Sequence, residues 1–173
     1  VKWNGNVQPC MVTTEEPEQV SEAGLNIKEM TTGAGAEADT LFSDENLPVL
    51  QLTAKAEDGE RIIRLDISGE DKENAAGTVY ITTEENAHVT VIEKFISGKK
   101  AQSDLAFRTK LYAKKNSTIR LIQINMLDEG QRLLNAVGSV CDETAKLDVL
   151  HLDIALDLLQ RFCLRQVCCL RRF

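Results

Sequence analysis

The chain has 173 residues, a formal net charge of −7 and 43 % hydrophobic residues, with aromatic residues making up only 5 %. Any hydrophobic core is therefore aliphatic. The acidic balance disfavours nucleic acids and anionic membrane surfaces as partners. No run of about 18 consecutive apolar residues occurs, so no transmembrane helix is predicted and no membrane contact is expected.

Cysteine usage indicates a reducing compartment. The number of cysteines, five, is odd, no CxxC pair occurs, and three of the five lie within the last eleven residues. This pattern favours a cytoplasmic protein over a disulfide scaffold. The sequence begins at Val1 and not at Met, so we expect a fragment or a processed product, and a targeting signal further upstream is compatible with it.

Residues 1–46 are interpreted as a leader that is partly flexible. From Thr13 to Asn46 the leader is acidic and rich in glycine, alanine and threonine. Residues 15–24 could form a short helix, with Pro17 in its first turn and Gly24 at its end.

A nine-residue phrase recurs three times in the body of the chain. It occupies residues 85–93, 115–123 and 143–151, at spacings of 30 and then 28 residues. Each copy reads charged, polar, small, polar, aliphatic, polar, aliphatic, aliphatic, polar, which is typical of a turn followed by a β-strand. A fixed period of this length predicts a stacked repeat architecture.

Further strands are predicted between and before these copies, so that one repeat consists of two strands and two turns. They cover residues 49–54, 61–67, 78–82, 105–113 and 132–140. A single repeat of about 28 residues buries too few aliphatic side chains to offset the entropy of ordering it. Repeats must therefore stack, and we predict a mainly β fold with an incomplete β-helix core over residues 47–155.

Residues 156–173 form an atypical C-terminal tail. Residues 157–173 carry four arginines against one aspartate, and no turn signal interrupts them. We predict a helix that lies across the open end of the sheet. A basic membrane-binding helix is one alternative, and a tail that is a reading-frame artefact and not the natural continuation is another.

Several stretches resemble the SufB/SufD family of iron–sulfur cluster assembly proteins. They are Gly59-Glu60-Arg61-Ile62-Ile63-Arg64-Leu65-Asp66, the phrase over 84–93, Arg108-Thr109-Lys110-Leu111, and the turn and strand over 115–123. The likeness covers about residues 45–155 and is closer to SufD than to SufB. It implies the N-terminal part of a right-handed parallel β-helix core.

The resemblance also implies a function. Members of this family are scaffolds that work with a SufB-like protein and a SufC-like ATPase, so we expect no enzymatic activity and no resident cofactor. An iron–sulfur cluster would be bound only transiently and in the full complex. The family's Cys-Ser-His-Gly-like motif does not occur here, and neither does its C-terminal helical region, unless the tail replaces that region.

Few residues suggest chemistry. Cys141 and His151 are the candidates for a cofactor-binding pair, and we predict no catalytic residue and no metal site. His88 and His151 are expected to face solvent, and Cys141 is expected to be a small core or turn residue at a strand end. Asp148 and Asp153 could serve a polysaccharide-cleaving β-helix as paired carboxylates, but solvated surface residues explain them equally well.

The leading hypothesis is a SufD-like, non-enzymatic scaffold for iron–sulfur cluster assembly. The alternatives are a carbohydrate-binding or carbohydrate-active β-helix and a structural repeat module with no chemistry of its own.

Overall fold

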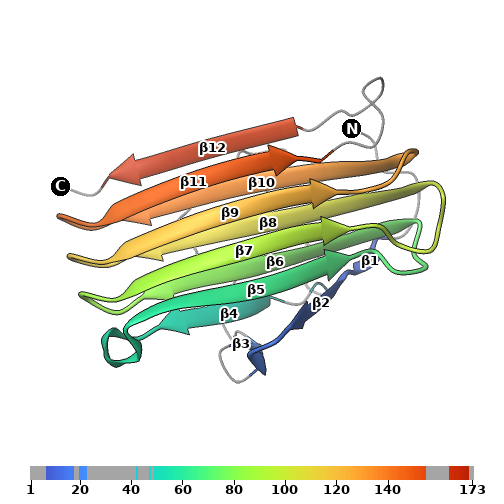
Figure 1. Cartoon of the computed structure of the whole chain (residues 1–173). Coiled ribbons are helices and arrows are strands. Elements are labelled where there is room, and N and C mark those ends of the chain that lie inside the picture. The colour runs from blue at the N-terminus through green and yellow to red at the C-terminus, as the bar shows by residue number, and fades with distance from the viewer. Residues whose placement is uncertain are drawn as a thin grey trace.

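A computed structural model describes residues 7–17, 20–22, 42, 47 and 49–154, and the backbone of 164–171. The polypeptide winds through about four stacked coils of two strands each, and this part of the chain contains no α-helix (Figure 1). The coil strands are β4 (Val49–Ala54), β5 (Glu60–Ser68), β6 (Asn74–Thr83), β7 (His88–Ile96), β8 (Ser103–Ala113), β9 (Thr118–Met126), β10 (Gln131–Cys141) and β11 (Lys146–Asp153). A short 3-10 helix, Ala56–Asp58, joins β4 to β5.

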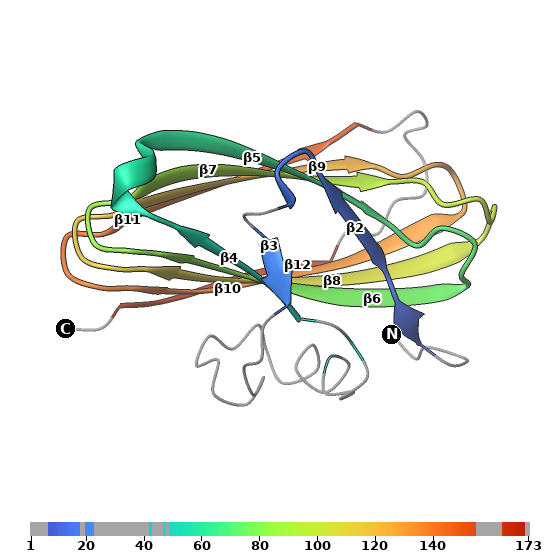
Figure 2. The same cartoon turned by 90° about the horizontal axis from the view of Figure 1, so that it is seen from below.

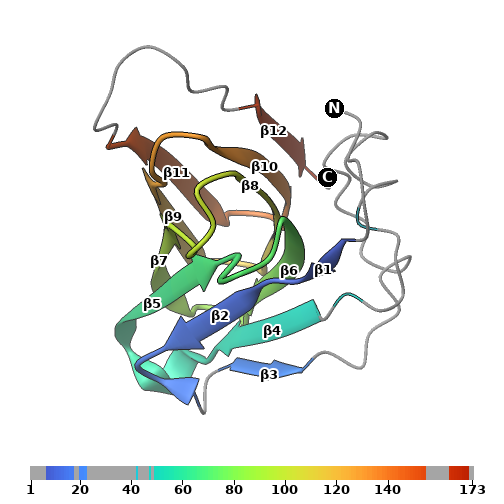
Figure 3. The same ribbon diagram turned by 90° about the vertical axis from the view of Figure 1, so that its right-hand side faces the viewer.

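The strands form two parallel walls. Strands β4, β6, β8 and β10 make one wall, and β5, β7, β9 and β11 make the other, as the two orthogonal views show (Figures 2 and 3). We number the coils β4–β5, β6–β7, β8–β9 and β10–β11 as first to fourth. This arrangement is a β-solenoid and confirms the predicted stack of two-strand repeats.

The pairing register confirms the spacing found in the sequence. His88 pairs with Thr118, and Thr118 pairs with Lys146, so equivalent positions of the three copies of the phrase lie side by side. Glu60 pairs with His88 in the same way, one coil earlier. Residues 57–65 therefore occupy the equivalent place in the first coil, although their sequence does not follow the pattern of the phrase.

The interior of the solenoid is filled by alternate side chains of each strand. Successive residues of a strand point to opposite faces, so every second side chain enters the space between the walls. The interior is mostly aliphatic, as expected, with Ile63, Leu65, Val91 and Leu121 at most 1 % exposed. Phe95 and Phe107 meet edge to face inside it, with ring centroids 5.7 Å apart.

Part of the predicted leader is built into the solenoid. Strand β1 (Gln8–Pro9) runs parallel to β6 at Ala75–Ala76, beside the place where β4 pairs with the rest of β6. Strand β2 (Met11–Thr14) runs antiparallel to β5, and β3 (Val20–Glu22) antiparallel to β4. Strands β2 and β3 cover the open edges of the first coil, and β1 covers the part of β6 that β4 leaves unpaired. These edges would otherwise expose unpaired backbone groups. The helix expected over 15–24 is wrong, because β3 occupies part of it.

Phe42 of the leader and Leu47 at the start of the predicted core pack outside the first wall. Phe42 is fully buried and Leu47 is 5 % exposed, and they contact the small side chains of Ala76, Ala106 and Ala136. The Phe42 ring also lies 4.9 Å from the Arg108 guanidinium carbon, a cation–π contact. Aromatic anchors of this kind hold the leader against the sheet.

The turns that join the walls stack as a ladder. Three of them have one residue in the left-handed region: Asn86 at φ 62°, Asn116 at φ 57° and Thr144 at φ 63°. Asn116 Nδ2 donates to Asn86 Oδ1 at 3.3 Å. Beside these turns, Thr83 Oγ1 donates to Ser117 Oγ at 2.7 Å. Side-chain hydrogen bonds thus tie each turn to the next.

The tail differs from the prediction. Residues 164–171 form strand β12 (Leu164–Arg171), which pairs in parallel with β10 from Leu134 to Cys141. The helix expected over 156–173 is therefore not found in this stretch, and the remaining tail positions lie outside the described residues. Strand β10 is the last coil strand of its wall, and its outer edge provides backbone hydrogen-bonding groups with which β12 pairs. Among the described residues, no helix is long and apolar enough to cross a membrane.

Candidate functional site

A buried carboxylate lies between the two walls. Glu93 on β7 is fully buried. Its oxygens accept hydrogen bonds from Thr109 Oγ1 at 2.9 Å and from Gln123 Nε2 at 2.7 Å. Both donors are neutral, so the carboxylate has no counter-charge at these contacts.

The hydrogen bonds continue into the fourth coil. Gln123 Nε2 also lies 3.2 Å from Asn135 Oδ1, and Asn135 Nδ2 donates to Gln123 Oε1 at 2.7 Å. Thr109, Gln123 and Asn135 are each at most 1 % exposed. We call Glu93, Thr109, Gln123 and Asn135 the polar core cluster.

His151 lies in the same interior column, that is, in the stack of inward-facing side chains contributed by one residue from each coil. The register places Leu65, Glu93, Gln123 and His151 above one another in successive coils. The His151 side chain is 6 % exposed, and its Nε2 lies 3.2 Å from Asp153 Oδ1. The column therefore runs from an apolar base through three polar residues to the fourth coil, where the Asp153 side chain is 46 % exposed.

Burial raises the pKa of Glu93 to about 7, although the hydrogen bonds from Gln123 and Thr109 act in the opposite direction. A charged group in a dry interior loses its hydration, and neutral donors replace only part of it. Glu93 is thus a carboxyl group that can hold or release a proton near neutral pH.

The structure does not bring Cys141 and His151 together. Cys141 is 6 % exposed and belongs to the hydrophobic core at the end of β10, as predicted. His151 is on the column that faces Asn135, and Cys141 lies six residues beyond Asn135 on β10, about 20 Å along the strand. A shared ligand between the two would need one of the strands to move.

The two histidines differ from each other. His88 is exposed at the start of β7, as expected. The expectation that His151 faces solvent is wrong, because Leu147, Val149 and His151 alternate along β11 and all point inward. The two consecutive aliphatic residues before His151 obscure this parity in the sequence.

The carboxylates Asp148 and Asp153 are not paired. Asp148 is in register with Arg120 on the outer face and lies 3.7 Å from its guanidinium. Asp153 instead accepts a hydrogen bond from the buried amide of Asn125 at 3.0 Å. Each carboxylate is thus engaged by a different partner at a different place on β11, and the two are not arranged on either side of one glycosidic bond.

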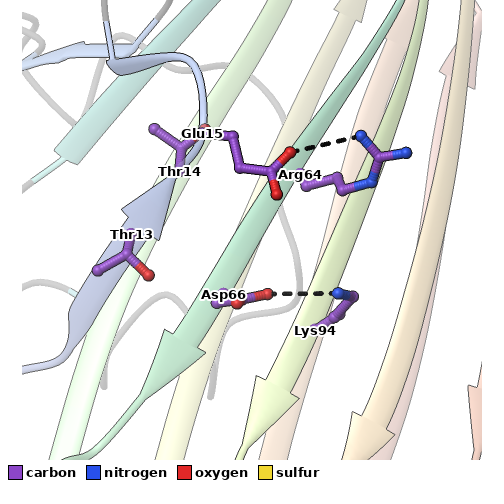
Figure 4. A pocket seen from close by; sticks show the side chains of 6 residues that line it. All are labelled: Thr13, Thr14, Glu15, Arg64, Asp66 and Lys94. Carbon is purple, nitrogen blue, oxygen red and sulfur yellow. Dashed lines mark ion pairs between the residues drawn. The ribbon is translucent and has the colours of Figure 1, made fainter.

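A shallow groove of about 180 Å³ opens where β2 meets the outer face of β5 and β7. Its charges are already matched: Glu15 lies 3.6 Å from Arg64, and Asp66 lies 3.8 Å from Lys94 (Figure 4). Ligand pockets of proteins are usually larger, roughly 300–1,000 Å³. The groove offers no unmatched charge to a ligand among the residues that line it, which are Thr13, Thr14, Glu15, Arg64, Asp66 and Lys94.

The outer face of β7, β9 and β11 carries an aliphatic patch beside its charged residues. This face is turned toward the viewer in Figure 1, with β11 at its upper side. Met126, Leu150, Leu152 and Ile154 are 42–52 % exposed. Three isoleucines adjoin them in register: Ile92, Ile122 and Ile124. A contiguous apolar surface of this kind is typical of a protein that contacts other macromolecules.

No group of three or more histidine, cysteine, aspartate and glutamate side chains in the described ranges is arranged to hold a metal ion. The notable chemical feature is therefore the polar core cluster, which sequence reasoning missed. Its signal was present at the last position of the repeated phrase, occupied by Glu93, Gln123 and His151. That position is four residues after the first aliphatic one, so period two places it inside.

Comparison with known proteins gives one family. Residues 66–160 match the family model described as SUF system FeS cluster assembly, SufBD core domain. The match spans the end of β5 through β11, which is most of the solenoid. No curated protein and no solved structure matches the chain.

Proposed function

The chain belongs to the SufBD core domain family of the SUF system for iron–sulfur cluster assembly, and from this premise we propose that it is a SufD-like scaffold. In this proposal it works in a complex with a SufB-like protein and a SufC-like ATPase and catalyses no reaction itself. The iron–sulfur cluster is the cargo of the complex and is held only transiently.

The family match laid over the stacked coils is the observation that supports this proposal. It runs from residue 66 to residue 160, more than half of the chain. Within it, the strands of consecutive coils pair with each other along nearly their whole length; for example, β8 pairs with β10 from Ser103 to Ala113. Such continuous pairing makes a stiff platform, which is what an assembly scaffold needs in order to hold partners at fixed positions.

The choice of SufD over SufB rests on the resemblance of residues 59–66, 84–93, 108–111 and 115–123. The same resemblance supports a right-handed winding of the coils. A cytoplasmic location, without nucleic-acid or membrane partners, agrees with the net charge of −7 and with the cysteine usage.

Co-purification tests the proposal. An affinity-tagged form of the chain, expressed together with the SufB-like and SufC-like proteins of its own source, should retain both through a wash at about 0.3 M salt, which screens surface charge contacts. A matched control carries Leu65→Asp, which places a charge inside the solenoid and should abolish retention by unfolding it. Recovery of neither partner with the folded, unsubstituted chain would contradict the proposal.

The carbohydrate alternative is not supported by a specific observation. Its candidate carboxylates have separate partners, since Asp148 pairs with Arg120 and Asp153 accepts from Asn125. A panel of acidic glycans provides the check, because a scaffold of this kind should neither bind nor cleave any of them.

A further inference from the structure

The polar core cluster ties three coils together. Glu93 belongs to the second coil, Thr109 and Gln123 to the third, and Asn135 to the fourth. Every hydrogen bond between Glu93 and its donors crosses from one coil to the next, and so does each bond between Gln123 and Asn135. The rest of the interior contact between these coils is largely aliphatic and does not depend on protonation.

The cluster accommodates a protonated Glu93 without moving a heavy atom. The Thr109 hydroxyl, 2.9 Å from Oε1, can donate a hydrogen bond to a charged carboxylate and can also accept one from a protonated carboxyl. Gln123 Nε2 continues to donate to the other oxygen. Protonation thus reverses one hydrogen bond and leaves the other in place.

The cluster stabilises the charged form of Glu93 less well than the protonated form. Its two donors are neutral, and a buried carboxylate without a counter-charge is costly. Among the described residues, those that face it from the neighbouring strands are all uncharged: Leu65 from β5, Val79 from β6, Thr109 from β8, Gln123 from β9 and Asn135 from β10. The titratable group on the same column is His151, one coil above Gln123.

We propose that the polar core cluster is a pH-sensitive latch: a proton on Glu93 keeps the second, third and fourth coils closed, and loss of that proton to solvent opens the strands around it to water. At the upper end of the column Asp153 is half exposed and contacts both His151 and Asn125, so this is the side of the cluster nearest to solvent among the described residues.

The stability of the folded chain should fall with rising pH, because folding raises the pKa of Glu93. Folding raises the pKa of Glu93 from 4.5 to about 7, because burial disfavours the charge. Between these values the folded chain holds a proton that the unfolded chain has released. Stability contributed by the latch is therefore complete below pH 4.5 and is lost as the pH rises through 7.

Glu93→Gln is the matched variant. Its amide has the shape of the protonated carboxyl and can donate to Thr109 while it accepts from Gln123, but it does not titrate. Between pH 5 and pH 8, the unfolding equilibrium constant of the unsubstituted chain in urea should rise on the order of 50-fold more than that of Glu93→Gln. Equal pH dependence of the two proteins would overturn the latch.

Two further measurements separate a latch from a simple buried acid. The Glu93 side-chain carbon, followed by NMR, should titrate near pH 7. Thr109→Val, which removes a hydrogen bond that favours the charge, should move this titration upward, whereas Thr109→Ser should leave it in place. Titration near pH 4.5 would contradict the proposal.

Hydrogen exchange locates the opening. As the pH rises from 6 to 8, amides of β7, β9 and β10 should lose more protection in the unsubstituted chain than in Glu93→Gln. Amides of β4 and β5, which lie below the cluster, should respond equally in both proteins. A uniform loss of protection over all strands would show that Glu93 acts on the whole fold and would overturn the latch.

Discussion

The backbone N–H of Asn116 donates a hydrogen bond to Thr144 Oγ1 at 3.2 Å, across the step from the third coil to the fourth. Both residues are in the left-handed region, at φ 57° and 63°. Asparagine tolerates this conformation, but a β-branched residue such as threonine is strained there. The turn ladder therefore contains one unfavourable step at Thr144.

Replacing Thr144 with asparagine should stabilise the chain. Thr144→Asn relieves backbone strain of about 1 kcal/mol and keeps a side-chain oxygen for the Asn116 N–H. The free energy of unfolding, measured in urea, should rise by a similar amount. Thr144→Ala is the control: it keeps a Cβ in the left-handed region, loses the hydrogen bond, and should lower stability. A Thr144→Asn chain less stable than the unsubstituted one would show that the turn is not strained.

A second prediction tests whether the leader is part of the core. A Cβ added at Gly77 would lie 2.4 Å from Cys10 Sγ and 3.3 Å from the Phe107 ring. Gly77→Ala should therefore cost about 1–3 kcal/mol of stability through overpacking. In the double variant with Cys10→Ala, part of this loss should be recovered, because the sulfur is gone. Strict additivity of the two substitutions would mean that Cys10 does not pack on β6.

The contact of Phe42 with the first wall gives a third prediction. Phe42→Ala removes a fully buried ring from Ala76, Ala106 and the Arg108 guanidinium. The free energy of unfolding should fall by about 3 kcal/mol. Phe42→Leu keeps most of the apolar volume and should lose clearly less. An alanine variant as stable as the unsubstituted chain would show that the anchor does not hold the leader.

Cys10 should be chemically inert in the folded chain. Burial raises the pKa of its thiol from 9.0 to about 12, against a smaller lowering by Lys72. At pH 8 about one thiol in ten thousand would be ionised, and the thiolate is the reactive form. Alkylation followed by peptide mass mapping should leave Cys10 unmodified in the native chain and modify it fully in urea. Rapid native labelling would contradict its buried position.

Much of the solenoid could be predicted from the sequence. The regular spacing of the phrases became the pairing register of His88 with Thr118 and of Thr118 with Lys146. Turn positions followed from the same pattern. Strand pairing by the leader could not be predicted, because β1 to β3 are two to four residues long and carry no clear periodicity. Their pairing comes from the open edges of β4, β5 and β6.

The polar core cluster was hidden for a different reason. Polar residues are normally assigned to the outer face of a strand, and Glu93 follows two consecutive aliphatic residues. Its interior position becomes visible only through parity with Val89 and Val91, which are buried. The predicted helix at 156–173 failed where β12 forms because the edge of β10 supplies backbone partners that the sequence of the tail does not reveal.

The central claim is that this solenoid serves as a SufD-like scaffold. Light scattering coupled to size-exclusion chromatography tests it most directly, on the chain mixed with its SufB-like and SufC-like partners at micromolar concentration. We predict a single species whose mass is the sum of all three components and which is absent when this chain is left out. Elution of the chain at its own mass of 19.2 kDa, apart from both partners, would contradict the account.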